Sequence, residues 1–434
     1  MARNKATALR STLHGVVGRR PVDALAKRLG VVKRSRKVDV FWLVWTLIFG
    51  FQVGAKRTID GLRQTYVRAT RRSLVRSAFY DRLTPSMAKL LYRLAQDILA
   101  AQLPGMRMPS GSLAGFTELL AIDSTVLRLR ELLAPAYQAS RTNHTKAAAK
   151  LHVVMNVACG SMRRVKLTSE RVSDTIPWRR VGQWVRGKLL LFDLGYYSFH
   201  LFDRIDANGG FFLSRVKNNF NPTITAVNRK WRGRAVEVVG RKLRDVLPLL
   251  ERGVLDVTVP VKFQTRAYRG RRRHRTREFR LVAVRNAETG GYHCYLTNVA
   301  AEVLPAEEIS QTYALRWQVE LLFMAMKTHG HLDQLPSGKR CVVECLVWAS
   351  VLQVLVSQEL YKLVRKAVAQ DRFMPALRWA TLMSRLARDL LDIAIGSRRS
   401  LAAELWDHLV AEAPDPNISR RKRAFDQVPA LAEA

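Results

Sequence analysis

Residues 189–193 read LLLFD, and residues 119–123 read LLAID. Each stretch is a short apolar run, typical of a buried strand, and each ends on an aspartate. The LLLFD stretch is followed by a predicted helix over residues 198–208, which stops at a pair of glycines, and then by a predicted strand over residues 211–216. Strands that alternate with a helix in this way indicate an α/β core.

Further strands extend this core on both sides. Residues 151–158 and 164–170 predict a hairpin around Gly160, and residues 292–298 predict another buried strand before a long helix. In between, residues 217–290 carry 19 Lys and Arg against 6 Asp and Glu and include a valine-rich strand over residues 254–262. We therefore expect a basic, β-rich insertion that interrupts the core.

An arginine-rich run spans residues 269–280 of this insertion. Most charge runs are solvated loops, and that interpretation stays open here. Because the arginines are so dense, we favour contact with a phosphate backbone.

The N-terminal region, residues 1–105, is predicted to be helical. Its apolar residues recur at helical spacing over residues 22–29, 38–51, 58–72 and 87–102. Residues 1–85 carry 19 Lys and Arg against 4 Asp and Glu. A basic helical unit of this kind favours insertion of a helix into a DNA groove, and the alternative is a helical bundle with solvated cationic faces.

The C-terminal region, residues 341–434, is predicted to be helical as well. It combines an apolar stretch over residues 341–355 with a basic cluster over residues 420–423. The region either packs on the core or pairs with a second copy of the chain, and the sequence leaves both options open.

Composition narrows the class of protein. The chain has 434 residues, 48% of them hydrophobic, and a formal net charge of +38. The apolar content indicates a globular protein of several folded units rather than a disordered one. Because so large a net charge destabilises a compact state unless counter-charge arrives, the charge predicts a polyanionic partner, nucleic acid ahead of an anionic membrane.

Several other classes are not expected. The apolar run over residues 40–53 is shorter than the roughly 20 residues that a membrane span needs, and the basic N-terminus leads into no apolar signal region. The stretch over residues 337–340, SGKR, lacks the rest of a phosphate-binding loop, so no nucleotide cofactor is expected. The four cysteines, Cys159, Cys294, Cys341 and Cys345, do not have zinc-site spacing, and we predict buried thiols in a reducing cytoplasm.

The long helix predicted between Pro305 and Gly330 carries a stripe of functional side chains. At 100° per residue, Tyr313, Arg316, Glu320 and Lys327 fall on one narrow face of a continuous helix. The opposite face is apolar and suits docking on a core; it carries Leu315, Val319, Leu322 and Met326.

Together with Asp123 and Asp193, which end two separate strands, Glu320 could complete a site for divalent metal ions. Three carboxylates can hold two Mg²⁺ ions, which suits in-line attack on a phosphodiester. The alternative is that Arg316 and Glu320 are an ordinary helical ion pair, that Tyr313 belongs to the core, and that Asp123 forms a turn.

These residues resemble a known family. The spacing of Tyr313, Arg316, Glu320 and Lys327 is similar to the YREK signature of bacterial insertion-sequence transposases of the DDE superfamily, in the group called the insertion-sequence-four family. Residues 122–127, IDSTVL, resemble the first aspartate motif of that family. Its second motif resembles residues 193–196 and 210–217, DLGY and GFFLSRVK, and residues 150–152, KLH, are also similar to family members. The resemblance covers about residues 113–350.

The resemblance implies a ribonuclease-H-like core in two parts, residues 113–216 and 291–340, which the insertion at 217–290 separates. It implies that Asp123, Asp193 and Glu320 are the catalytic residues and the ligands of two Mg²⁺ ions, for which Mn²⁺ can substitute. It also implies that a set of basic and aromatic side chains binds DNA phosphates or lies close to the cleaved strand: Tyr313, Arg316, Lys327, Trp317, Arg215 and Lys217.

The resemblance further implies a cut-and-paste DNA transposase that cleaves transposon ends, commonly through hairpin intermediates in this family, and transfers them into target DNA. The expected partners are double-stranded DNA, as terminal inverted repeats and as target, and a second copy of the chain in a homodimer on paired ends. We expect the protein in the bacterial cytoplasm, associated with the nucleoid and with no membrane.

Other functions stay open at this point. A DNA-binding regulator descended from a transposase would bind without cutting, and a ribonuclease-H-like nuclease would hydrolyse DNA without joining it. The intact set of Asp123, Asp193 and Glu320 disfavours the regulator, and it also disfavours a purely structural basic scaffold. Joining of a pre-cleaved end to plasmid DNA would separate a transposase from a nuclease.

Overall fold

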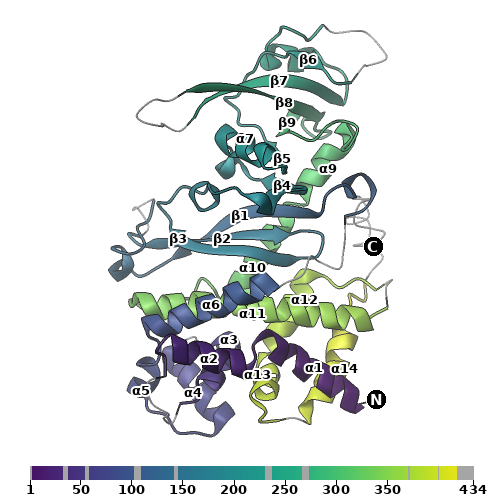
Figure 1. Ribbon diagram of the computed structural model, residues 1–434. Helices are drawn as coiled ribbons and strands as arrows, with labels where there is room; N and C mark the ends of the chain where they lie inside the picture. Colours follow the sequence, from purple (N-terminus) through teal and green to yellow (C-terminus); the bar gives the residue numbers. More distant parts are fainter. Residues whose placement is uncertain are drawn as a thin grey trace.

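The computed structural model describes residues 2–32, 38–53, 58–101, 109–140, 145–229, 237–265, 273–369, 372–398 and 400–417. The predicted basic cluster at residues 420–423 lies outside the described residues, as do residues 269–272 of the arginine-rich run. The fold is mixed α/β, with one large sheet and a thick layer of helices below one end of it (Figure 1).

The sheet has nine strands in the order β3-β2-β1-β4-β5-β9-β8-β7-β6. The strands β1, β4 and β5 pair in parallel, whereas β2 runs antiparallel to both β1 and β3. The predicted hairpin around Gly160 is therefore present. The first five strands are β1 (Glu118–Arg128), β2 (Ala148–Asn156), β3 (Ser161–Ser169), β4 (Lys188–Phe192) and β5 (Phe211–Arg215).

Successive residues of the central strands face opposite sides of the sheet. Leu119 and Leu191 pack into the core shared with the helical layer, while Leu120 and Phe192 pack against α7 (Phe199–Ala207) on the other side. Both faces are covered, which is why these strands read as nearly continuous apolar runs.

The basic segment after β5 extends the same sheet by antiparallel pairing. After the short helix α8 (Leu243–Val246), β7 and β8 form a long hairpin, and β9 returns to pair with β5. The strands are β6 (Ala226–Val227), β7 (Val254–Gln264), β8 (His274–Arg285) and β9 (Tyr292–Thr297).

The described part of the arginine-rich run lies in strand β8 from His274 onward and is not a solvated loop. Arg275 and Arg277 both donate to Asp203 of α7, and Arg280 is buried against Asp256 of β7. The expected phosphate contact was wrong for Arg280, which is buried and paired with a carboxylate distant in sequence. For Arg275 and Arg277, which are 44% and 35% exposed, it stays a prediction.

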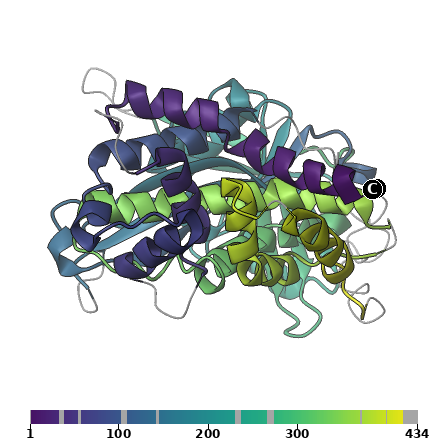
Figure 2. The same cartoon turned by 90° about the horizontal axis from the view of Figure 1, so that it is seen from below.

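Helices from the two ends of the chain form one layer. The long helix α11 packs along α6 and contacts α1 and α3, and α1 also packs against α14. Figure 2 shows the purple N-terminal helices beside the yellow C-terminal ones over this face. The C-terminal region therefore packs on the rest of the chain, one of the two options that the sequence left open.

The N-terminal helices are α1 (Ala2–Val16), α2 (Arg19–Arg28), α3 (Val40–Phe49), α4 (Ile59–Thr70), α5 (Arg76–Tyr80) and α6 (Pro85–Ala101). Pro85 begins α6, a position where its missing N–H costs nothing. The sequence did not predict α1 and α5. The C-terminal helices are α11 (Arg340–Ala367), α12 (Ala376–Arg385), α13 (Ala387–Ile395) and α14 (Leu401–Glu412).

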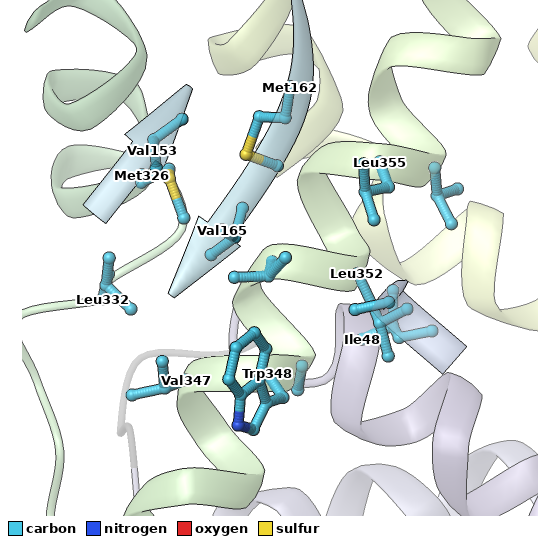
Figure 3. Packing of buried hydrophobic residues seen from close by; sticks show 14 of the residues in the cluster. Ile48, Val153, Met162, Val165, Met326, Leu332, Val347, Trp348, Leu352 and Leu355 are labelled. Atoms are coloured by element: carbon cyan, nitrogen blue, oxygen red, sulfur yellow. The ribbon is translucent and has the colours of Figure 1, made fainter. Parts of the chain in front are cut away.

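Helix α11 is the central element of the helical layer. By length and composition alone it could cross a membrane, but 67% of its apolar window is buried within the protein. Figure 3 shows its side chains meeting Ile48 of α3 on one side and Val165 of β3 on the other. This burial is typical of the core helix of a globular protein. The shorter apolar run over residues 40–53 contains the buried helix α3.

The prediction of four buried thiols was only partly right. Cys345 is buried, and its burial raises the pKa of the thiol. The other three cysteines are half-buried, and all four are free.

A buried ion pair holds the segment that leads from the sheet to the next helices. The guanidinium of Arg280 donates to Asp256 at 2.6 Å and to the carbonyls of Val299 and Leu304 at 3.2 and 2.7 Å. Both side chains of the pair are almost fully buried. The pair therefore fixes the start of the chain segment that continues into α9 (Ile309–Ala314) and α10 (Trp317–Thr328).

We predict that Asp256→Ala destabilises the protein by about 3 to 5 kcal/mol, because it leaves the charge of Arg280 buried without a partner. The matched control is Asp407→Ala, which removes an exposed ion pair with Lys5 and should cost less than about 1 kcal/mol. Thermal unfolding checks both; equal midpoints for the two variants would contradict the role of the buried pair.

Candidate active site

The helix that carries the predicted functional stripe is broken in the middle. A short 3₁₀ turn (Ala306–Glu308) leads into α9 (Ile309–Ala314), and α10 (Trp317–Thr328) follows after a tight turn. At this turn the amide of Arg316 donates to the carbonyl of Tyr313 at 3.0 Å, an i to i+3 bond. The prediction of one continuous α-helix was therefore wrong, although Leu315 and Arg316 at the turn keep helical backbone angles.

The two aspartates lie on neighbouring parallel strands at matching positions. Asp193 comes directly after β4, as predicted, but Asp123 lies inside β1, which continues to Arg128. The parallel pairing of the two strands ends at Ile122 and Phe192, so each aspartate is the next residue after the last pair. Asp123 marks the end of the parallel pairing and not the end of its strand.

Arg316 connects the first aspartate with the glutamate. Its guanidinium donates to Glu320 at 2.6 Å and to Asp123 at 3.5 Å. The side chain of Arg316 is 13% exposed, that of Asp123 19% and that of Glu320 31%, so all three are at least half-buried. Arg316 and Glu320 do form an i,i+4 ion pair, but the contact with Asp123 makes this pair part of a larger site.

The carboxylates influence one another. The pKa of Asp123 is raised to about 6, mainly by burial and also by the negative charges of Asp193 and Glu320. The amide of Ser124, which donates to Asp123, and the charge of Arg316 act in the opposite direction. Asp193 also acts on the pKa values of Tyr313 and Arg316. The three acidic residues therefore belong to one electrostatic site.

Within the described parts of the chain, no three His, Cys, Asp or Glu side chains are close enough together to hold a metal ion as they stand. The arrangement nevertheless fits a cation, because Asp123 and Glu320 already share one, the guanidinium of Arg316. Their oxygen atoms are also the ligands that Mg²⁺ prefers. A metal ion would require Arg316 to move aside.

Tyr313 is buried beside this site. Its ring lies 5.3 Å from the ring of Tyr295 and 5.7 Å from the guanidinium carbon of Arg316. Burial raises the pKa of Tyr313 to about 12, and the nearby guanidinium of Arg316 acts in the opposite direction. Tyr313 is thus both a core residue and a neighbour of the charged groups.

The other four predicted DNA-binding residues lie on α10 and at, or just after, the end of β5. Trp317 is 58% exposed at the start of α10. Lys327 lies at the far end of that helix, near Asp333 and Arg128, and burial lowers its pKa. Arg215 is the residue after Ser214, which pairs with Phe192, and its guanidinium bonds His293 at 2.9 Å. Lys217 lies over the ring of Tyr197 at 5.7 Å. Lys327 is on the same helix as Glu320, seven residues further along.

Sequence reasoning missed a fourth carboxylate close to the site. Asp174 accepts hydrogen bonds from Ser124 at 2.9 Å and from Lys150 at 3.1 Å. It lies in a loop with no periodic pattern, so no motif marked it. Ser124 and Lys150 had been quoted only as parts of family-like stretches.

Comparisons with known proteins identify the class. The family model described as a transposase DDE domain matches residues 114–353, more than half of the chain. The chain therefore belongs to the family of transposases with a DDE domain. It is an insertion-sequence transposase, an enzyme that acts on DNA, and membership of this family implies dependence on a divalent metal ion.

Individual relatives agree with this class. The chain is 20% identical over 380 residues to the transposase for insertion sequence element IS231B of Bacillus thuringiensis subsp. berliner, with 80% of this chain and 78% of the relative covered. It is 22% identical over 370 residues to that for IS231D of Bacillus thuringiensis subsp. finitimus, with 79% and 77% covered. Among solved structures, the piggyBac transposase synaptic complex with hairpin DNA is similar at a TM-score of 0.48 and 11% identity, over 100% of this chain and 85% of that one.

The raised pKa of Asp123 predicts a pH-dependent stability. Between its ordinary value of 3.8 and about 6, the folded protein holds a proton that the unfolded chain has released. Asp123 therefore contributes less to the stability of the folded state as the pH rises through this range, by about 1 to 3 kcal/mol in total, and the loss is complete about one pH unit above the folded pKa.

We predict that Asp123→Asn, which keeps the hydrogen-bond acceptor without the charge, stabilises the metal-free protein at about pH 8 by about 1 to 3 kcal/mol and leaves it unchanged near pH 4. Urea unfolding in a chelator measures this. The control is Asp97→Asn on the exposed face of α6. A variant equally or less stable than the native protein at pH 8 would contradict the electrostatic account of the site.

Proposed function

We propose that the chain cleaves DNA at the ends of a transposon and transfers those ends into target DNA, with Asp123, Asp193 and Glu320 as catalytic residues. The observation that carries this proposal is the shared cation of Arg316 between Asp123 and Glu320, beside Asp193. Acidic residues from three separate elements gather there in spite of their mutual repulsion, which an ordinary structural ion pair does not require.

The order of the first five strands supports a ribonuclease-H-like core. Among the first five strands, in the order β3-β2-β1-β4-β5, β2 alone runs in the direction opposite to the other four. In this proposal residues 113–216 and 291–340 form the core, residues 217–290 are an insertion, and residues 1–105 bind DNA. The strands of residues 217–290 continue the sheet, so the insertion would enlarge the core rather than form a separate domain.

Two Mg²⁺ ions, or Mn²⁺ in their place, would bind to Asp123, Asp193 and Glu320, activate the attacking hydroxyl group and stabilise the leaving oxygen. The protein side chains orient these ligands. The backbone amide of Ser124 donates to Asp123 at 2.8 Å. Arg316 binds Glu320 until this carboxylate is released. Arg316 would then be free to bind a DNA phosphate in the same place.

The surrounding residues suit a DNA strand. Trp317 exposes a large aromatic face next to Arg316, which favours stacking on a base near the cleaved bond. Lys327, Arg215 and Lys217 would bind flanking phosphates. Since Lys327 lies two turns of α10 away from Glu320, we place its phosphate about 10 Å from the reaction.

Joining of DNA needs no nucleotide cofactor in this proposal, because transesterification exchanges one phosphodiester for another. We propose a homodimer that holds two terminal inverted repeats together, in the bacterial cytoplasm and associated with the nucleoid. Excision through hairpin intermediates remains part of this proposal. A nuclease that cuts without joining is the alternative, which joining of a pre-cleaved end to plasmid DNA would exclude.

We predict that Asp123→Ala, Asp193→Ala and Glu320→Ala each abolish metal-dependent nicking of a DNA fragment that carries the cognate terminal repeat, but leave binding of that fragment intact. The reason is that each variant removes a metal ligand and leaves the DNA-binding cations in place. Gel assays of cutting and of binding measure the two effects separately. The control is Glu404→Ala on the exposed face of α14. Undiminished cutting by any one of the three variants would reject the assignment.

We also predict that Lys327→Ala lowers strand transfer by about tenfold, the size of one lost phosphate contact of about 1.4 kcal/mol. Thermal stability should stay nearly unchanged, because Lys327 makes no ion pair within the described residues. Strand transfer at the native rate, or a loss of stability that matches the loss of transfer, would show that Lys327 has only a structural role.

A further inference from the structure

Asp174 lies behind the site, on the face of the sheet opposite to Asp123. Side chains alternate along β1, so Asp123 faces α10 and Ser124 faces the other side. There the hydroxyl of Ser124 donates to Asp174 Oδ1 at 2.9 Å. The side chain of Asp174 is only 23% exposed, beside the apolar core on this face of the sheet.

The same carboxylate contacts the segment that carries the second aspartate. A β-carbon built on Gly195 would lie 3.6 Å from Asp174 Oδ2, so the turn after Asp193 passes near Asp174 without a hydrogen bond to it. The next residue, Tyr196, is buried, and its hydroxyl lies close enough to Ser124 and Asp174 to be affected by both. Asp174 therefore bonds the segment that carries Asp123 and lies near the one that carries Asp193.

A second strand secures the position of Asp174. Lys150 of β2 donates to Asp174 Oδ1 at 3.1 Å and to the carbonyl of Val172 at 3.4 Å. His152, also on β2, is fully buried, with Nδ1 3.9 Å from the same oxygen and Nε2 bonded to Thr168 at 2.8 Å. Because Lys150 compensates its charge, Asp174 is suited to hold neighbouring groups in place and not to bind a metal ion itself.

Ser124 links Asp174 on one face of the sheet to Asp123 on the other. Its hydroxyl bonds Asp174, while its amide bonds Asp123 Oδ1 at 2.8 Å, so a single residue has a contact on each face. A shift of Ser124 would move the Asp123 carboxylate. In metal sites, partners that orient the ligands typically contribute 10- to 100-fold to metal affinity.

We propose that Asp174 is a positioning residue that, through Ser124, holds Asp123 at the orientation that a divalent metal ion shared with Asp193 needs. This inference rests on the proposed function, which makes the two aspartates metal ligands. It assigns to the loop residue Asp174 a role that no motif of the sequence indicated.

The test is the binding of Mn²⁺ alone to the full-length protein, measured from the loss of the free-ion electron paramagnetic resonance signal. Asp174→Ala should raise the dissociation constant about 10- to 100-fold. Ser124→Ala should have a similar effect, and the double variant should be no weaker than either single one, because both remove the same link. Asp174→Asn should have a smaller effect, since its amide oxygen still accepts from Ser124.

The matched control is Thr168→Val, which removes a hydrogen bond to His152 in the same cluster without touching Asp174 or Ser124. It should lower thermal stability but leave Mn²⁺ affinity at the native value. Equal weakening by Thr168→Val and Asp174→Ala would reduce Asp174 to a structural role and overturn the proposal. If Asp174→Ala does not fold, native affinity in both Ser124→Ala and Asp174→Asn would overturn it as well.

Asp123→Ala separates this proposal from the proposed function. Loss of Mn²⁺ binding in Asp123→Ala, together with native binding in Asp174→Ala, would overturn only the role of Asp174. Native binding in Asp123→Ala would show that Asp123 is no metal ligand, and both proposals would then fall.

Discussion

The guanidinium of Arg316, held between Asp123 and Glu320, is the interaction on which the arrangement of this protein depends. Burial and repulsion both disfavour charged carboxylates at this place, as the raised pKa of Asp123 shows. A cation between them offsets part of that cost. The same electrostatic demand makes the site suitable for a divalent metal ion and for a DNA phosphate bound through the released arginine.

The rest of the fold brings these groups together. Parallel pairing of β1 with β4 puts the two aspartates side by side, and the tight turn before α10 directs Arg316 toward them. Arg280 and Asp256, buried in the basic half of the sheet, fix the segment that leads to this turn. The helical layer then supports α10 from below through α12 and the buried face at Val319 and Met326 (Figure 1). Distant parts of the chain thus contribute to the geometry of one small site.

Much of this could be predicted from the sequence, and the failures have physical causes. Apolar runs predicted β4 and β5 almost to the residue, because buried strands need continuous apolar sequence. Helical periodicity placed Arg316 and Glu320 close together, yet it could not show the 3₁₀ turn that separates α9 from α10, since that turn depends on tertiary packing. Arg280 of β8 was misread and Asp174 was missed for a related reason. Their partners are remote in sequence, and only the folded chain shows them.

The central claim is that Asp123, Asp193 and Glu320 can bind the same metal ions once Arg316 moves away. Anomalous X-ray scattering from crystals of the protein with Mn²⁺ tests this most directly. The account predicts manganese peaks bound by oxygens of all three residues, with Arg316 displaced from Asp123. Manganese bound elsewhere, or an Arg316 that keeps both carboxylates in a crystal saturated with the ion, would contradict it.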